Sequence, residues 1–192
     1  DPLDFSLMQE NLRTIEQSVM RIDRIVLDLM DTVSIEQGRL ALSLMPSDLG
    51  TLLHSVEKDF SSHPSSGNNQ LVLTIQPDLP EISADPERLI QVVTNLISNA
   101  ERHTRNGIIT ISLSGGPRWQ TICVSDTGSG MSEEMRKNAL KGYVSADKDY
   151  WRHGIGLYVC HQIITAHGGK IWIESEEGKG TRVFFSLPEE ES

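Results

Sequence analysis

The sequence predicts a mixed α/β domain that is preceded by one long helix. From residue 39 onward, segments with the apolar period of helices alternate with short apolar runs that are typical of strands. Before that point, one apolar seam runs along the chain without a break. We therefore expect a helical dimerisation segment at residues 1–38 and one α/β domain at residues 39–192.

The N-terminal segment carries apolar residues at alternating steps of four and three. This spacing is a heptad seam, which is typical of a helix that packs against a partner helix. The helix is expected to end near Gly38, because glycine can serve as a helix stop. The alternative is an ordinary amphipathic helix that packs on its own domain. The seam consists of Met8, Leu12, Ile15, Val19, Ile22, Val26, Leu29 and Val33.

Turn and cap signals divide the α/β domain into elements. Asp85 and Pro86 predict the N-cap and the first position of a helix. Ser132 marks the start of a short helix, and a longer helix is expected to end at His167. The other expected elements are a helix at 47–60, strands at 71–75, 107–113 and 120–124, and a hairpin of strands 170–175 and 181–187.

Charge and composition exclude several classes of partner. The 192 residues carry a formal net charge of −10, which argues against nucleic acid and against an anionic membrane surface. No apolar run approaches the ~20 residues that a bilayer span requires. Cys123 and Cys160 lie far apart without a CxxC pattern, which indicates a reduced, cytoplasmic setting. The chain starts at Asp1, so we expect a fragment of a longer protein and leave open whether that protein is a membrane-bound sensor.

The stretch VSDTGSGM places Asp126 at the end of a strand and glycines directly after it. A carboxylate in front of the glycines would repel phosphate, but it can accept a hydrogen bond from an exocyclic amine such as that of adenine. Glycines allow the backbone to approach a flat base. One alternative is an Asx turn between strand and helix. Another is the aspartate of an aspartic protease, which needs a second copy that this chain does not contain.

A second pair of glycines, Gly154 and Gly156 in HGIGLYV, opens a helix whose free N–H groups would attract phosphate. The segment before it has an excess of positive charge in an otherwise acidic chain. We interpret this segment as a lid that collects a triphosphate, and the alternative is a solvated loop of chance composition. The expected phosphate contacts in this lid are Lys141, Tyr143 and Arg152.

The helix sequence VVTNLISNAERHT carries two amides and a cation on one face. Asn99 is a neutral oxygen donor that can hold Mg²⁺ on a nucleotide. Arg102 would help to neutralise phosphate charge, and His103 would lie near the base or the sugar. The alternative is that Asn95 and Asn99 are buried amides that only pack helices together.

The order of these motifs resembles the ATP-binding domain of sensor histidine kinases. The motifs are Asn-x-x-x-Asn, Asp-x-Gly-x-Gly, Gly-x-Gly-Leu and Gly-x-Gly-Thr, and the resemblance covers about residues 39–188. It implies the two-layer α/β sandwich known as the Bergerat or GHKL fold, shared with DNA gyrase, heat-shock chaperone ATPases and MutL. It also implies a site for ATP and Mg²⁺ made by Asn95, Asn99, Arg102, His103, Asp126, Gly128, Gly130, Met131, Gly154, Gly156, Leu157 and Thr181.

Within this resemblance, each motif has an expected role. Asn95 and Asn99 would belong to the magnesium and phosphate site, with Asn99 as the metal ligand. Asp126 would contact the adenine amine, with Thr181 and the glycines of its own loop around the base. The second pair of glycines and Leu157 would close over the phosphates.

The resemblance implies transfer of the γ-phosphoryl of ATP to a histidine and relay to the receiver domain of a response regulator. ATP-hydrolysing relatives carry a glutamate at the position of Asn95, and an amide cannot take the proton of water. This difference favours a kinase over an ATPase. The alternatives are an ATP-gated dimerisation module without catalysis, or a serine kinase or anti-sigma-like protein of the same superfamily.

Two departures from the kinase pattern stand out. The phosphate-accepting histidine lies on the first dimerisation helix in such kinases, but no histidine precedes His54 here. We therefore expect no autophosphorylation by this chain. The heptad seam separately predicts a homodimer through the N-terminal helix. In addition, ALKGYV at 139–144 replaces the usual Phe-rich box, which puts the contact between the lid and the acceptor helix in doubt.

Overall fold

The chain divides into two compact units, Asp1–Arg39 and Leu40–Ser192. The structure is a computed structural model that describes residues 8, 15, 19, 30, 33–35, 37, 40–61, 68–116, 118–141 and 155–189. No helix within these described ranges is both long and apolar enough to cross a bilayer.

The first unit is described at a few positions, and these include part of the predicted seam. Met8, Ile15, Val19 and Val33 are helical, and each is exposed in the single chain, by 45% for Val33 and by more for the others. The pairing of this helix with a partner remains a prediction. The seam residues Leu12, Ile22, Val26 and Leu29 lie outside the described residues.

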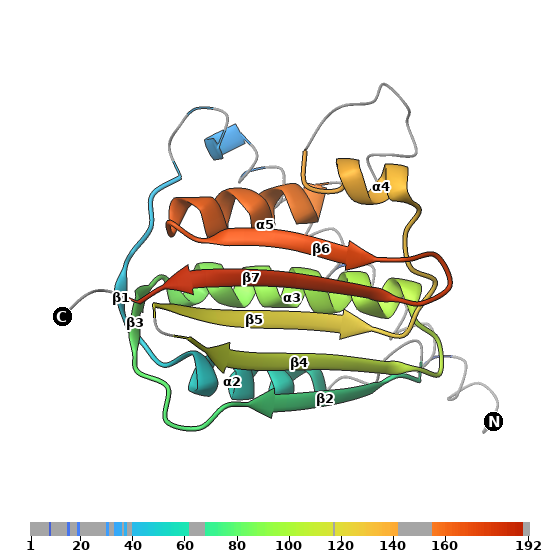
Figure 1. Ribbon diagram of the computed structural model, residues 1–192, viewed down its shortest axis with the longest axis horizontal. Helices are drawn as coiled ribbons and strands as arrows, with labels where there is room; N and C mark the ends of the chain where they lie inside the picture. Colours follow the sequence, from blue (N-terminus) through green and yellow to red (C-terminus); the bar gives the residue numbers. More distant parts are fainter. Residues whose placement is uncertain are drawn as a thin grey trace. The chain divides into compact units, whose positions relative to one another are not determined.

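The second unit is built on a five-stranded sheet in the order β2-β4-β5-β7-β6 (Figure 1). β2 pairs with β4 in parallel, and the other neighbours are antiparallel. The last hairpin therefore extends the sheet beside β5, with β7 between β5 and β6 and with β6 as the edge strand. The strands are β2 (Gln70–Ile75), β4 (Ile108–Gly115), β5 (Trp119–Asp126), β6 (Lys170–Ser175) and β7 (Thr181–Pro188).

Three helices, α2 (Leu49–Ser61), α3 (Pro86–His103) and α5 (Ile155–Ala166), form a layer behind the sheet in Figure 1. The apolar faces of helices and sheet meet in a core whose side chains are almost completely buried. This arrangement is a two-layer α/β sandwich, so the predicted fold class is confirmed. Representative core residues are Leu53, Leu89, Val93, Ile111, Ile122, Ile163 and Phe185.

The N-terminus of α3 is fixed by Asp85, as the sequence predicts. Its carboxylate accepts hydrogen bonds from the backbone N–H of Arg88 at 3.1 Å and of Ser43 at 2.8 Å. Its own N–H donates to Nε2 of His167 at 3.0 Å, and Nδ1 of that ring lies 2.8 Å from the carbonyl oxygen of Ile163. A ring that accepts at Nε2 and donates at Nδ1 is neutral. One histidine thus joins the end of α5 to the start of α3, which carries the predicted site.

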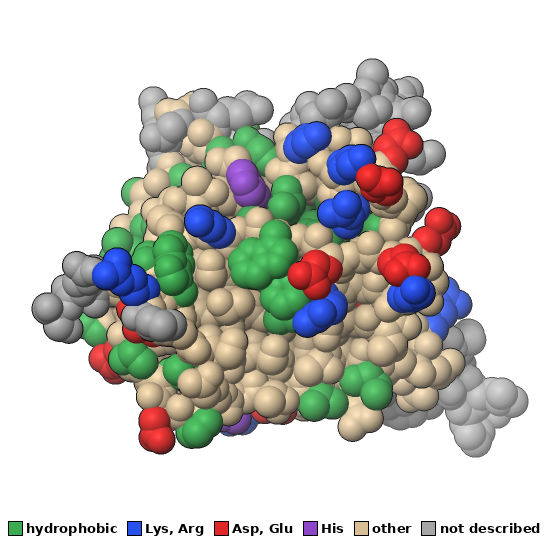
Figure 2. Space-filling model, viewed as in Figure 1, with side chains coloured by type: hydrophobic (Ala, Val, Ile, Leu, Met, Phe, Trp, Pro, Cys, Tyr) green, Lys and Arg blue, Asp and Glu red, His purple; other side chains and the backbone are tan. Residues whose placement is uncertain are grey.

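Within the described part of residues 40–189, no helix covers the other face of the sheet, which is the face seen in Figure 2. Aromatic and charged side chains cover part of it. Trp172 stacks on Phe184 with ring centroids 5.1 Å apart, and the guanidinium of Arg182 lies 4.8 Å from the Phe184 centroid. Arg182 also forms an ion pair with Glu174 at 3.2 Å. The Trp172–Phe184 and Glu174–Arg182 pairs are cross-strand pairs that hold β6 to β7 from the solvent side.

The structure contains two short strands that the sequence analysis does not predict. β1 (Met45–Ser47) and β3 (Ile82–Ala84) pair in antiparallel fashion as a separate two-stranded sheet. Ser47 is buried there, and its hydroxyl donates to the carbonyl oxygen of Met45 at 2.9 Å. A short helix, α4 (Glu133–Asn138), begins after Ser132, which accepts from the N–H of Met135.

Candidate functional site

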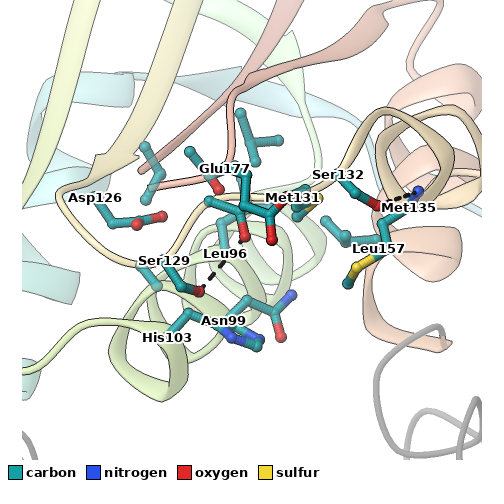
Figure 3. A pocket seen from close by; sticks show the side chains of 15 residues that line it. Leu96, Asn99, His103, Asp126, Ser129, Met131, Ser132, Met135, Leu157 and Glu177 are labelled. Carbon is teal, nitrogen blue, oxygen red and sulfur yellow. Dashed lines mark hydrogen bonds between the residues drawn. The ribbon is translucent and has the colours of Figure 1, made fainter. Parts of the chain in front are cut away.

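A pocket of about 370 Å³ lies among α3, the loop after β5, the β6–β7 turn and the start of α5. In Figure 3, Asp126 lies near one end of it and Met135 and Leu157 lie near the other, with Asn99 and His103 projecting from α3. A volume of this size is typical of a site for a small molecule. The pocket is lined by Leu96, Asn99, Ala100, His103, Val124, Asp126, Ser129, Gly130, Met131, Ser132, Met135, Leu157, Glu177, Thr181 and Val183.

Asp126 is the half-buried acidic group of this pocket. It is the last residue of β5 and is paired with Thr181, the first residue of β7. Burial raises the pKa of the Asp126 carboxyl, although the N–H groups of Gly128 and Thr181 donate hydrogen bonds to it and act in the opposite direction. The bond from Gly128 is 2.8 Å long. The carboxylate is thus held by its own loop and can accept a hydrogen bond from a ligand.

The glycines near Asp126 allow backbone segments to approach closely. A Cβ on Gly130, at φ +67°, would lie 2.0 Å from the carbonyl oxygen of Glu176. A Cβ on Gly180, at φ +86°, would lie 2.0 Å from the carbonyl oxygen of Asp126. No side chain fits at either distance, so the loop after β5 and the β6–β7 turn lie against each other only because both residues are glycine. The glycines thereby bring Asp126 and Thr181 to the same pocket.

The walls of the pocket are mostly apolar. Side chains of Leu96, Val124, Met131 and Leu157 line it together with Val183. Methionine is unbranched and adapts its shape to a neighbour. Apolar walls around one acceptor group suit a flat heterocycle that has an amine at one edge.

The polar face of α3 divides into positions inside and outside the pocket. Asn99 is partly exposed, and it lines the pocket together with His103. Asn95 is buried, at 3% exposure, and a Cβ on Gly156 would lie 3.8 Å from its Cγ. Arg102 is exposed and is not among the lining residues. The structure therefore brings together only part of the face that the sequence predicts.

The remaining predicted residues have mixed positions. Gly128 lies next to the pocket rather than in its lining, and a Cβ there would lie 2.3 Å from the carbonyl oxygen of His103. Lys141 follows α4, is exposed and does not line the pocket. The predictions for Tyr143, Arg152 and Gly154 fall outside the described residues.

The lining includes residues that sequence reasoning does not identify. Ser129 and Glu177 lie in loops and Met135 lies on α4, and nothing in their spacing distinguishes them. Ser132 was identified only as a helix start. The only sequence signal for these residues is that they lie close to the glycine motifs.

The described residues contain no group of three or more His, Cys, Asp or Glu side chains that could hold a metal ion by themselves. Asn99 supplies one neutral oxygen in the pocket. This donor set fits Mg²⁺, which usually keeps several waters and takes its other ligands from phosphates. It does not fit a metal that the protein would hold in a complete cage.

An α/β sandwich that gathers an acidic strand end, glycine loops and an amide-bearing helix around one pocket defines a nucleotide-binding domain of the GHKL class. The chain belongs to the histidine kinase-, DNA gyrase B- and HSP90-like ATPase family, whose sequence profile matches residues 84–191. The family predicted from the order of the motifs is thereby confirmed.

Individual relatives point to one branch of this family. The chain is 34% identical over 171 residues to the adaptive-response sensory kinase SasA of Synechococcus elongatus, which covers 87% of the chain and 44% of SasA. It is 34% identical over 169 residues to the sensor histidine kinase ZraS of Escherichia coli, which covers 88% of the chain and 35% of ZraS. The chain thus spans less than half the length of either protein. The catalytic ATPase domain is the type found in sensor histidine kinases.

Solved structures agree with this fold. Full-length ShkA in complex with AMPPNP has a TM-score of 0.75 at 27% identity, covering 85% of this chain and 35% of ShkA. The nucleotide-free catalytic domain of the histidine kinase ThkA has a TM-score of 0.66 at 27% identity, covering 77% of this chain and 97% of that domain.

Proposed function

We propose that the pocket binds ATP with Mg²⁺, and that the parent protein transfers the γ-phosphoryl group of ATP to a histidine for relay to the receiver domain of a response regulator. The family and the named sensor kinases among its relatives support this function. So does the AMPPNP complex of ShkA, which is a similar structure. The observation that carries the proposal for this chain is the half-buried Asp126 carboxylate in a pocket with apolar walls.

In this proposal, the adenine base lies between the apolar walls with its 6-amine toward Asp126. The carboxylate accepts one hydrogen bond from the amine. The N–H of Gly128 donates to the same carboxylate and holds it in position. Thr181, which is paired with Asp126, lines the same part of the pocket. Base recognition would thus rest on the junction of β5 and β7.

The phosphates would lie toward Asn99 and the start of α5. Asn99 would supply one oxygen to Mg²⁺, and the ion would screen the negative charge of the phosphates. Asn95, Arg102 and the glycine pair at Gly154 and Gly156 would belong to this phosphate end of the site. Lys141, Tyr143 and Arg152 would add contacts from the segment between α4 and α5.

The chemistry needs little from the protein beyond position and charge. The bond between the γ-phosphorus and the β–γ bridging oxygen breaks, a bond to the histidine nitrogen forms, and ADP leaves. By the resemblance, Asn95 stands where ATP-hydrolysing members of the superfamily carry a glutamate, and an amide cannot take the proton of water. We therefore expect slow ATP hydrolysis and transfer to an acceptor histidine supplied by the parent protein.

Titration calorimetry with AMPPNP tests this function. Asp126→Asn should lower affinity by ~10-fold or more, because a charge-assisted hydrogen bond is worth ~1.5–3 kcal/mol. Asp78→Asn makes the same change of charge at a residue outside the pocket lining and should leave affinity unchanged. Asn99→Ala should remove the part of the affinity that depends on Mg²⁺, whereas Thr94→Ala, an exposed α3 position, should not. Equal affinities for all four variants and the parent chain would reject the proposed site.

We further propose that the N-terminal helix forms a homodimer through the heptad seam in a cytoplasmic setting. Val19 lies on the seam, and Met30 lies off it; both are helical and exposed. Light scattering after gel filtration should show that Val19→Glu weakens a dimer more than Met30→Glu does. Equal effects of the two charges, or a monomer in the parent chain, would argue against this interface.

A further inference from the structure

Ser175, the last residue of β6, makes three polar contacts through one hydroxyl group. Its Oγ accepts from the N–H of Met131 at 2.9 Å and donates to the carbonyl oxygen of Gly180 at 2.9 Å. It also lies 3.0 Å from Oγ1 of Thr181. Ser175 does not line the pocket itself, so it would act on a ligand only through these neighbours.

The hydrogen-bond balance of this cluster determines the direction of the third contact. A serine hydroxyl has one proton, and the Gly180 carbonyl can only accept, so that proton is committed to it. The contact between Ser175 and Thr181 is then a hydrogen bond only if Thr181 donates. The proton of the Thr181 hydroxyl therefore points at Ser175, and the lone pairs of Oγ1 remain for other partners.

This assignment gives the pocket two neighbouring groups that only accept hydrogen bonds. Asp126 is a carboxylate, and Thr181 is its paired residue on β7 with its proton directed away. An exocyclic amine has two hydrogens and suits two acceptors. A carbonyl oxygen at the same position would meet acceptors on both sides and would lose its hydrogen bonds to water without replacement.

We propose that Ser175 is a positioning residue that fixes Thr181 as an acceptor, so that the pocket selects a purine with a 6-amine over a purine with a 6-oxo group. This inference rests on the proposed function, because it assigns the base specificity of that same site. Without Ser175, the Thr181 hydroxyl can rotate and donate to a 6-oxo group, so the discrimination should weaken.

The test compares binding of ATP and ITP, which differ at position 6 of the base, by calorimetry in the presence of Mg²⁺. The parent chain should prefer ATP. Ser175→Ala should reduce the ratio of the two affinities by about fivefold or more. Ser175→Thr keeps the hydroxyl and should restore the ratio. Ser47→Ala removes the hydroxyl of a buried serine in the β1–β3 sheet, away from the pocket, and should leave the ratio unchanged.

If Ser175 had only a structural role, Ser175→Ala would lower the affinities for ATP and ITP together and leave their ratio unchanged. A second comparison, in the Thr181→Val variant, also distinguishes a structural role from a positioning role. In Thr181→Val the acceptor is gone, and adding Ser175→Ala should change the ratio no further. If Ser175→Ala does not fold, Ser175→Cys provides the same comparison with a weaker donor. An unchanged ratio in the Ser175 variants, an equal effect in the Thr181→Val background, or a parent chain that binds both nucleotides equally would overturn this inference alone. A parent chain that binds neither nucleotide would overturn the proposed function.

Discussion

Asp126 and Thr181 are paired residues of β5 and β7, and the N–H of Thr181 donates a hydrogen bond to the Asp126 carboxyl. Despite this bond, burial raises the pKa of Asp126 above its usual value. The folded protein therefore binds a proton at Asp126 more readily than the unfolded chain does. The stability that this group contributes is present below the unfolded pKa and is lost as the pH rises through the folded pKa.

The raised pKa means that the charged form of Asp126 destabilises the folded protein near pH 7. Asp126→Asn should therefore raise the melting temperature of the nucleotide-free protein at that pH, because the substitution removes a half-buried charge. The gain should shrink as the pH falls through the raised folded pKa of Asp126, because the carboxyl then takes up a proton and loses its charge. Calorimetric melting across this pH range measures the effect. A melting temperature below that of the parent chain at neutral pH would contradict it, and Asp78→Asn serves as the control for a change of net charge.

The contact between the two glycine-bearing turns predicts a large cost for Gly180→Ala. The added Cβ meets the carbonyl oxygen of Asp126 and the backbone is at φ +86°, so we expect a loss of about 2–4 kcal/mol in the free energy of unfolding. Gly178→Ala is the matched control, since its φ is +79° but nothing lies within 4 Å of the added Cβ. It should cost only about 1 kcal/mol. Equal losses in urea unfolding would show that the close approach does not matter.

The cap of α3 predicts a dependence of stability on acid. Burial opposes the charge of Asp85, but the hydrogen bonds from the backbone N–H groups of Ser43 and Arg88 hold its pKa below the usual value of an aspartate. Because the folded pKa is depressed, this contribution to stability is present above the unfolded pKa and is lost as the pH falls through the folded pKa.

Asp85→Ala should accordingly lower the free energy of unfolding by about 1–2 kcal/mol at neutral pH, and by less in acid. Ser132→Ala removes the cap of the shorter, exposed helix α4 and should cost less. Urea titrations at the two pH values give both numbers. A penalty for Asp85→Ala that is the same in acid would contradict the role of its carboxylate.

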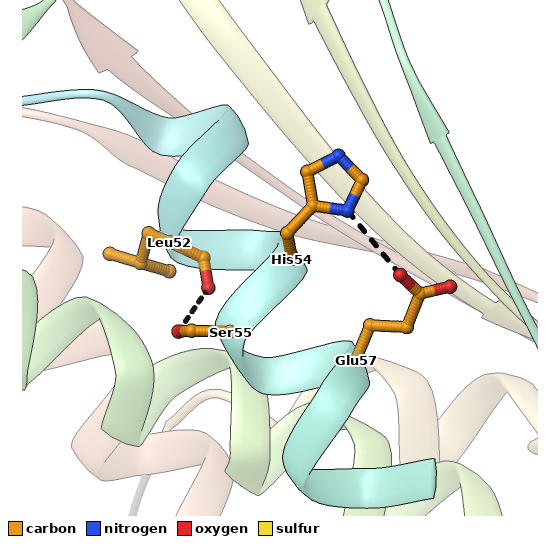
Figure 4. A network of polar contacts seen from close by, with 4 residues as sticks. All are labelled: Leu52, His54, Ser55 and Glu57. Atoms are coloured by element: carbon orange, nitrogen blue, oxygen red, sulfur yellow. Dashed lines mark hydrogen bonds and ion pairs between the residues drawn. The ribbon is translucent and has the colours of Figure 1, made fainter.

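His54 provides a test of the missing acceptor. It is the first histidine of the chain and lies on α2, where its side chain is 67% exposed. Its Nδ1 faces Glu57 of the same helix at 3.4 Å, while Ser55 donates to the carbonyl oxygen of Leu52 (Figure 4). Nothing in this arrangement directs His54 to the pocket, whose lining does not include it.

Incubation with γ-labelled ATP should therefore leave no acid-labile label on this chain, even at concentrations that saturate the site. His54→Ala should behave in the same way. Label on the parent chain that disappears in His54→Ala would make His54 an acceptor. Label that persists in this variant would place an acceptor elsewhere in the chain, and either result would reject the expectation.

The sequence predicted the α/β class and most elements because their signals are local. The cap at Asp85, the apolar stripe of α3 and the final hairpin each lie within a short window, and the structure has them within about two residues of the expected bounds. β1 and β3 were missed because a strand of three residues shows no period. The parallel pairing of β2 with β4 was also invisible, since register depends on the packed sheet.

The candidate site was predictable in part for the same reason. Asp126, Gly130 and Thr181 belong to motifs and do meet at one pocket. The burial of Asn95 could not be predicted, because an amide at one helical turn from Asn99 fits either a ligand or a packing role. The hydrogen bond between Ser175 and Met131 joins segments that are distant in sequence, and a lone serine at a strand end carries no signal of it.

A crystal structure of the chain with AMPPNP and Mg²⁺ tests the central claim most directly. We predict that the base lies among the apolar walls, with its 6-amine within hydrogen-bond distance of the Asp126 carboxylate, and that the metal lies at the oxygen of Asn99. A pocket closed by its own side chains, or a nucleotide bound elsewhere with Asp126 untouched, would contradict the account.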